Sequence, residues 1–193
     1  CAACLAWPLL DDDPTPLADT SLAVGQALAD GLRTQPAMAP GERFLLTKCL
    51  LDHHGQQMDT LAVARLIALE QDKLRSQPPA PAVLAQWWFL VMSHHEYFGD
   101  TSAAVQARQR LQSLIDAHGL PDARFALLVG DMPLALKAGQ LARAERIHRE
   151  LEALMPEARA GFLPQGLRAQ ASFLAQRGDC AAALMRIDRL LAL

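Results

Sequence analysis

The chain has 193 residues and a net charge of -3, and hydrophobic residues make up 51% of it although only 5% are aromatic. Its 18 basic residues are scattered rather than gathered in one stripe, which argues against direct contact with nucleic acid. No run of 18 apolar residues and no export signal is seen, so we expect a cytoplasmic protein that does not enter a membrane. Alanine and leucine dominate the hydrophobic share, and this composition predicts an all-α fold.

The four cysteines are Cys1, Cys4, Cys49 and Cys180. We interpret them as small buried hydrophobic residues of a reducing compartment. Cys1 and Cys4 have the spacing of a zinc site, but no second Cys/His pair follows at finger distance. Cys1 is also where a mature lipoprotein would begin on its lipidated cysteine, and a fragment of a longer polypeptide is the alternative.

Residues 1–40 are expected to form an incomplete first helix pair. A short segment ends at Leu10, an acidic loop runs from Asp11 to Pro16, and a helix is predicted from about Ala18 to Arg33. The loop from Gln35 to Gly41 then leads into the first complete repeat.

Glycine turns divide the rest of the chain into repeating helix-turn-helix units. The turn glycines are Gly55, Gly99, Gly139 and Gly178, separated by 44, 40 and 39 residues. Each glycine closes one apolar-periodic segment, and a second segment begins within a few residues. Residues 1–193 are therefore predicted to form one solenoid, with repeats at 41–77, 81–120, 121–156 and 158–193.

Two columns of residues recur at fixed distances from these glycines. Small residues lie five positions beyond the turns, where two helices cross closely, and apolar ridge residues lie twelve positions beyond. The small column is Thr60, Ala104, Ala144 and Ala183, and the ridge is Ile67, Leu111, Leu151 and Leu190. Asp59 and Thr101 are predicted helix caps, and Pro133 with Gly130 predicts a kink or break.

The pattern resembles the tetratricopeptide repeat family. Phe44 and Trp88 match its bulky position early in the first helix, and Pro156 matches its closing proline. The resemblance implies a right-handed superhelix of four to five antiparallel helix pairs with a concave binding groove.

The period near 40 residues, together with Trp7, Pro8 and Leu9, is more similar to the helical-repeat region of large bacterial signal-transducing ATPases. The maltotriose-responsive, LuxR-type transcription activators are the known example. In that family the repeats sense an inducer or a partner protein, whereas a separate domain contacts DNA.

Transferring the groove of the tetratricopeptide fold onto this chain nominates nine residues. These are Asp52, His53, Phe89, Ser93, Glu96, Tyr97, Lys137, Arg168 and Gln176. Apolar area with a few fixed polar groups suits a protein, a peptide or a small-molecule inducer. No cofactor is expected, and the apolar faces at the ends of the chain suggest that it could form a homodimer.

Two histidine clusters leave other functions open. His53-His54 and His94-His95-Glu96 both occur near the end of a first helix, so they could hold zinc or supply acid-base chemistry. Attraction to the negative end of a helix dipole explains them equally well. We expect a non-catalytic sensing or interaction region of a signalling regulator, with a tetratricopeptide adaptor, assembly lipoprotein or chaperone as first alternative and a metal-dependent enzyme as second.

Overall fold

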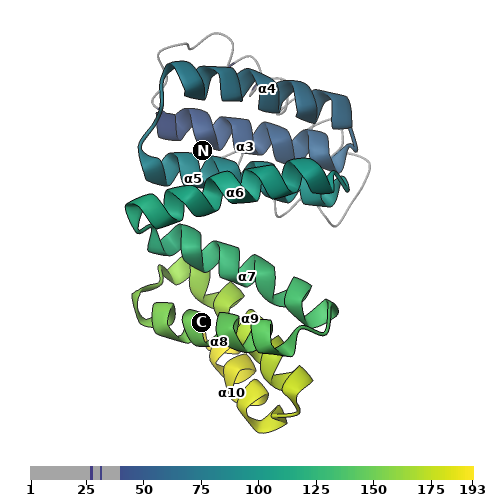
Figure 1. Ribbon diagram of the computed structural model, residues 1–193, viewed down its shortest axis with the longest axis vertical. Helices are drawn as coiled ribbons and strands as arrows, with labels where there is room; N and C mark the ends of the chain where they lie inside the picture. The colour runs from purple at the N-terminus through teal and green to yellow at the C-terminus, as the bar shows by residue number, and fades with distance from the viewer. Residues whose placement is uncertain (1–26, 28–30, 32–39) are drawn as a thin grey trace. The chain divides into compact units, whose positions relative to one another are not determined.

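The computed structural model describes Ala27, Gly31 and residues 40–193, and the predicted incomplete pair at 1–40 therefore lies almost wholly outside the described residues. The described part forms eight α-helices and two short 3-10 helices and contains no strand, which confirms the predicted all-α class (Figure 1). It divides into two compact units, Cys1–Arg108 and Gln109–Leu193, which are described separately below.

The first unit contains three complete helices of the described chain. These are α3 (Pro40–Gln56), α4 (Thr60–Ser76) and α5 (Pro81–Tyr97), and α6 (Thr101–His118) begins in this unit and crosses its boundary. Helix α3 packs against both α4 and α5. Pro81 starts α5, where the missing N–H is no loss because first-turn N–H groups have no partner within the helix.

The second unit contains α7 (Pro121–Lys137), α8 (Leu141–Leu154), α9 (Leu163–Arg177) and α10 (Cys180–Leu191). Two 3-10 helices, η2 (Met155–Glu157) and η3 (Ala160–Phe162), connect α8 to α9. Helix α9 contacts α7, α8 and α10, and the shared core includes Phe125, Leu151 and Phe173. The predicted closing proline, Pro156, lies in η2 directly after α8.

Three of the four predicted glycine turns are confirmed. Gly99, Gly139 and Gly178 have φ values of 79°, 67° and 89°, in the left-handed region that glycine adopts without steric penalty. In each turn the N–H of the glycine donates to a carbonyl three residues earlier, and the next N–H donates to one five residues earlier. This pair of bonds satisfies carbonyls that the end of the first helix leaves free.

The first turn was assigned to the wrong residue. Gly55 lies inside α3, buried beside His94, and Met58 takes the left-handed conformation with φ 55°. Its hydrogen bonds to Gly55 and those of Asp59 to His54 reproduce the pattern of the other three turns. With Met58 as the reference, the turns are separated by 41, 40 and 39 residues, which is more regular than the sequence suggested.

The two predicted columns follow the same correction. Ala104, Ala144 and Ala183 are buried as predicted, but Thr60 is exposed at the start of α4, and Val63 is the buried residue five positions beyond Met58. The ridge residues Ile67, Leu111 and Leu151 are buried, and Leu190 is half-buried, but the residue twelve positions beyond Met58 is Glu70, which is also buried.

Two local predictions are corrected at helix ends and at the proline. Asp59 caps α4 by accepting from the N–H of Ala62, as predicted, but Asp100 rather than Thr101 accepts from the N–H of Ala103 in α6. Helix α7 runs from Pro121 to Lys137 without the predicted break, although Pro133 lies inside it, and a kink there stays a prediction. Pro133 is exposed, so its ring displaces no core residue.

The reduced state predicted for the cysteines is also wrong for one of them. Cys49 is disulfide-bonded, whereas Cys180 is free and exposed. Cys1 and Cys4, the predicted zinc-type pair, lie outside the described residues.

Candidate functional site

The C-terminal ends of α3 and α5 bring together polar side chains that are far apart in the sequence. Nε2 of His94 lies 3.7 Å from Oδ1 of Asp52, and Lys48 donates a hydrogen bond to Oδ2 of the same carboxylate. Burial raises the pKa of Asp52, but the hydrogen bonds and positive charges of His94 and Lys48 outweigh burial, so its pKa lies below the usual value. Asp52 is therefore a fixed, half-buried negative charge.

Two exposed apolar side chains lie next to this carboxylate-histidine pair. Tyr97 is 67% exposed and Met58 is 60% exposed, and the Tyr97 hydroxyl donates to the Met58 sulfur at 3.7 Å. The ring of Phe98 lies edge-on to Tyr97, with centroids 5.1 Å apart, and stacks on His94 at 6.5 Å. We call these five residues, Asp52, Met58, His94, Tyr97 and Phe98, the turn cluster.

Three other predicted groove residues share α5 with Tyr97. Phe89 and Ser93 are half-buried at four-residue spacing on the face that carries Tyr97, and the Ser93 hydroxyl donates to the Phe89 carbonyl at 2.9 Å. Glu96 is exposed. Phe89, Ser93 and Tyr97 thus form one continuous strip along α5.

His53 does not line a surface. Its side chain is buried, with 5% exposure, and its ring lies edge-on to His54 at 5.5 Å. Burial, aided by the positive charge of His54, lowers the pKa of His53 and favours its neutral form. The groove prediction failed here because His53 faces the core of the hairpin rather than solvent.

The predicted groove residues of the second unit are Lys137, Arg168 and Gln176, and all three are exposed. Gln176 donates from Nε2 to the carbonyl of Leu136 at 3.3 Å, which links α9 to α7. One groove that includes residues of both units stays a prediction.

Two of the clustered histidines lie near carboxylates. Nε2 of His94 on α5 lies near Asp52 on α3, and Nδ1 of His95 lies 3.7 Å from Asp100 in the turn that follows α5. No three His, Cys, Asp or Glu side chains within the described residues are arranged to hold a metal ion.

Sequence reasoning missed Met58, and the signal that would have found it is the dipeptide that follows. Asp59-Thr60 after Met58 repeats Asp100-Thr101 after Gly99, which places the two turns in the same register. The contact between Tyr97 and Met58 then follows, because residues near equivalent turns of stacked hairpins lie at the same end of the stack.

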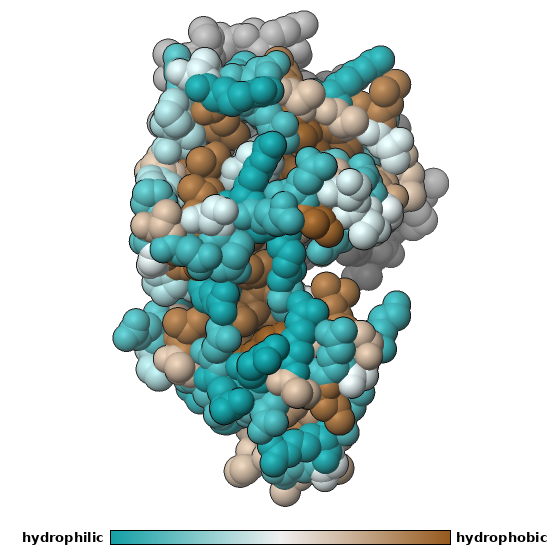
Figure 2. All heavy atoms as spheres, in the orientation of Figure 1, coloured by the Kyte–Doolittle hydropathy of each residue, from teal (hydrophilic) through white to brown (hydrophobic). Residues whose placement is uncertain are grey.

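Neither a protein-family model nor a curated protein nor a solved structure matches this chain. Among the described helices, none is both long and apolar enough to cross a lipid bilayer. On the face drawn in Figure 2, polar and charged side chains cover most of the surface, with apolar side chains scattered among them.

Proposed function

We propose that this chain is a non-catalytic binding module that recognises a segment of a partner protein at the turn cluster. The observation that carries the proposal is the contact between Tyr97 and Met58, two large side chains that are both more than half exposed. The resemblance to tetratricopeptide repeats and to the sensing region of LuxR-type regulators supports it, as does the recurrence of helix hairpins within each unit. We propose that the hairpins continue one right-handed superhelix.

The chemistry of the turn cluster suits recognition of a protein segment. Tyrosine is enriched at the energetically dominant positions of protein interfaces, because it adds a large rigid area and one polar group. Methionine adapts its shape to different partners. Beside them, Asp52 supplies a fixed negative charge that selects a donor or a basic side chain on the partner.

The non-catalytic part of the proposal is supported by the environment of the histidines. His94 has Asp52 as its polar partner in the described part of the chain, and its ring is held between Gly55 and Phe98. A buried imidazole that is held in this way contributes packing and a polar contact, and lacks the exposed reactive position that a general base needs.

The test is partner capture with a matched control. A photo-activated cross-linking residue at position 97 is expected to trap a discrete partner in the native cell, and Tyr97→Ala is expected to weaken binding of that partner by at least about tenfold. Leu69 is 52% exposed on α4 of the same unit, so Leu69→Ala is the control and should leave binding unchanged. Equal losses for the two variants, or no adduct at position 97, would contradict the proposal.

One observation favours the adaptor or assembly-factor alternative over a cytoplasmic signalling regulator. Disulfide bonds persist in oxidising compartments and are rare in the cytosol, and Cys49 is disulfide-bonded. Thiol alkylation of the protein from its native cell should modify Cys180 at once and Cys49 only after reduction. Alkylation of Cys49 without reductant would instead support the cytoplasmic regulator.

A further inference from the structure

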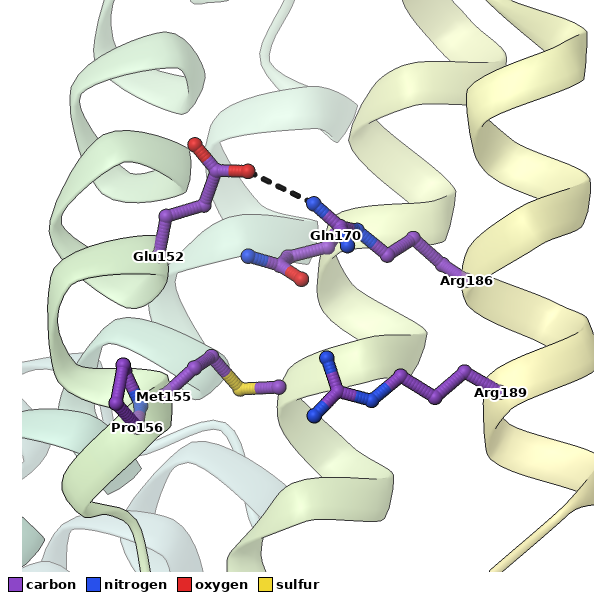
Figure 3. A pocket seen from close by; sticks show the side chains of 6 residues that line it. All are labelled: Glu152, Met155, Pro156, Gln170, Arg186 and Arg189. Atoms are coloured by element: carbon purple, nitrogen blue, oxygen red, sulfur yellow. Dashed lines mark hydrogen bonds and ion pairs between the residues drawn. The ribbon is translucent and has the colours of Figure 1, made fainter.

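A second candidate site lies wholly within the second unit, away from every residue of the turn cluster. Helices α8, α9 and α10 together with η2 line an open pocket of about 280 Å³ (Figure 3). It is lined by Glu152, Met155, Pro156, Gln170, Arg186 and Arg189. The pocket therefore combines two guanidinium groups, one carboxylate and one carboxamide with an apolar edge.

Two buried donors of this pocket have no acceptor within the described chain. Gln170 is 1% exposed, and its Nε2 makes no hydrogen bond, although its carboxamide projects into the space between α8 and α10 (Figure 3). Nε of Arg186 is likewise buried and unbonded, while its terminal nitrogen donates to Glu152 at 2.8 Å. Buried donors without partners are unfavourable, and two of them converging on one pocket indicate that an acceptor from outside belongs there.

The charges of the pocket define that acceptor further. Glu152 neutralises Arg186, and Nε2 of His148 lies 3.6 Å from the same carboxylate. Burial lowers the pKa of His148, so His148 adds no charge at neutral pH. Arg189 is exposed and makes no hydrogen bond or ion pair among the described residues, which leaves one positive charge in surplus.

We propose that this pocket binds a monocarboxylate with a small apolar body. The carboxylate accepts from Nε2 of Gln170 and Nε of Arg186, Arg189 supplies the opposing charge, and the apolar body contacts Met155 and Pro156. A phosphate group, with a charge of about -1.5 to -2, would exceed the single surplus charge and meet the carboxylate of Glu152. The ligand is either a free small acid or the C-terminus of a peptide, since both present the same carboxylate chemistry.

Titration of the ¹⁵N-labelled chain with four probes tests the proposal by following the side-chain amide resonance of Gln170. Isovalerate and acetyl-Gly-Leu with a free C-terminus carry the carboxylate, acetyl-Gly-Leu-amide lacks it, and inorganic phosphate tests the alternative anion. We expect the carboxylate probes to shift this resonance saturably and the amide to leave it unchanged. Tighter binding of the peptide acid than of isovalerate assigns the site to a C-terminus, and the reverse order assigns it to a free acid.

Matched variants separate binding from folding. Arg189→Gln is expected to weaken carboxylate binding by roughly tenfold or more. Arg146→Gln changes an exposed arginine of α8 outside the pocket and should alter binding by less than twofold. Equal binding of the amide, tighter binding of phosphate, no saturable shift with any probe, or full affinity in a folded Arg189→Gln protein would each overturn the proposal.

Discussion

The two units use the same hairpin but fill an equivalent position differently. Twelve residues beyond the turn at Gly139, the second unit buries Leu151 in an apolar core. Twelve residues beyond Met58, the first unit buries Glu70, whose carboxylate accepts from Nε of Arg43 at 2.8 Å and from a terminal nitrogen at 2.5 Å. A hairpin of one length therefore tolerates either an apolar ridge or a buried ion pair, provided that the pair is complete.

The comparison extends to a second arginine-glutamate pair. Arg124 lies fifteen residues before Gly139, as Arg43 lies fifteen before Met58, and Nε of Arg124 donates to Glu150 at 3.1 Å. This second pair is much more exposed than the first. An arginine-glutamate ion pair therefore links paired helices in both units, and it is largely buried in the first unit and more exposed in the second.

Removing Glu70 gives the largest expected effect. Glu70→Ala leaves the guanidinium of Arg43 buried without its partner, and we expect the free energy of unfolding to fall by about 3 kcal/mol. Urea unfolding followed by tryptophan fluorescence reports this loss, because all three tryptophans belong to residues 1–108.

The double variant Arg43→Met with Glu70→Leu makes the first unit resemble the second. Replacing a complete buried pair by apolar side chains is often neutral or stabilising, so stability should return to within about 1 kcal/mol of the wild type or exceed it. A double variant as unstable as Glu70→Ala would show that the pair has no apolar substitute here.

Glycine substitutions compare close packing in the two units. A Cβ atom at Gly166 would lie 2.5 Å from the Phe125 ring and 2.8 Å from the Met155 sulfur, so Gly166→Ala should destabilise the second unit by about 2 kcal/mol. At Gly55 the nearest atom, on His94, would lie 3.4 Å away, and Gly55→Ala should change stability by less than about 1 kcal/mol. Gly130→Ala is the control and should stabilise α7, because no atom lies within 4 Å of the added Cβ. Far-UV circular dichroism during urea unfolding measures the stability of all three variants.

At Met58 a change to glycine should relieve backbone strain, whereas at the other turns a change away from glycine should introduce it. A non-glycine residue in the left-handed region is strained by about 1 kcal/mol, so Met58→Gly should be more stable than Met58→Ala by about that amount. Both variants lose the contact to Tyr97, so the difference between them reports the backbone strain alone. Equal midpoints of urea unfolding for the two variants would show that no strain is stored at this turn.

Acidification gives the smallest expected effect and acts through His148 of the second unit. The pKa of His148 is lowered mainly by burial, with Glu152 opposing and Arg186 and Arg177 reinforcing, so the unfolded chain binds a proton more readily than the folded one. The stabilisation that neutral His148 provides is fully present above its pKa in the unfolded state, about 6.5, and is lost as the pH falls below that value. The urea midpoint of the wild type should fall between pH 7.5 and 5.5, and His148→Gln should reduce this fall. The same pH dependence in the variant would exclude His148 as the cause of the fall.

The parts of the fold that could be predicted from sequence are those set by local physics. Glycine adopts the left-handed turn cheaply, and a small side chain is needed where helices cross, so Gly99 and Ala104 could be assigned without coordinates. Gly55 was wrongly assigned to a turn, because a glycine is also found where another side chain approaches the backbone closely, and at Gly55 that side chain is His94. Periodicity alone cannot separate these two uses.

The candidate sites depended on contacts that sequence spacing does not encode. Asp52 meets His94 across 42 positions, and the pocket around Gln170 takes residues from three helices and a 3-10 turn. Both require the stacking of one hairpin on another, which is settled by side-chain packing rather than by local preference. Of the nine predicted groove residues, Asp52 and Tyr97 enter the turn cluster, and His53 is removed by its burial.

The turn cluster and the comparison of the two units both require the register in which Met58, and not Gly55, closes the first hairpin. Nuclear Overhauser measurements on the ¹⁵N-labelled protein test it directly, because a residue with positive φ brings its own amide and Hα protons unusually close. We predict a strong intraresidue amide-to-Hα cross-peak for Met58 and helical cross-peaks through Gly55. A weak, helix-like cross-peak at Met58, with a break in helical connectivity at Gly55, would contradict the register and the turn cluster built on it.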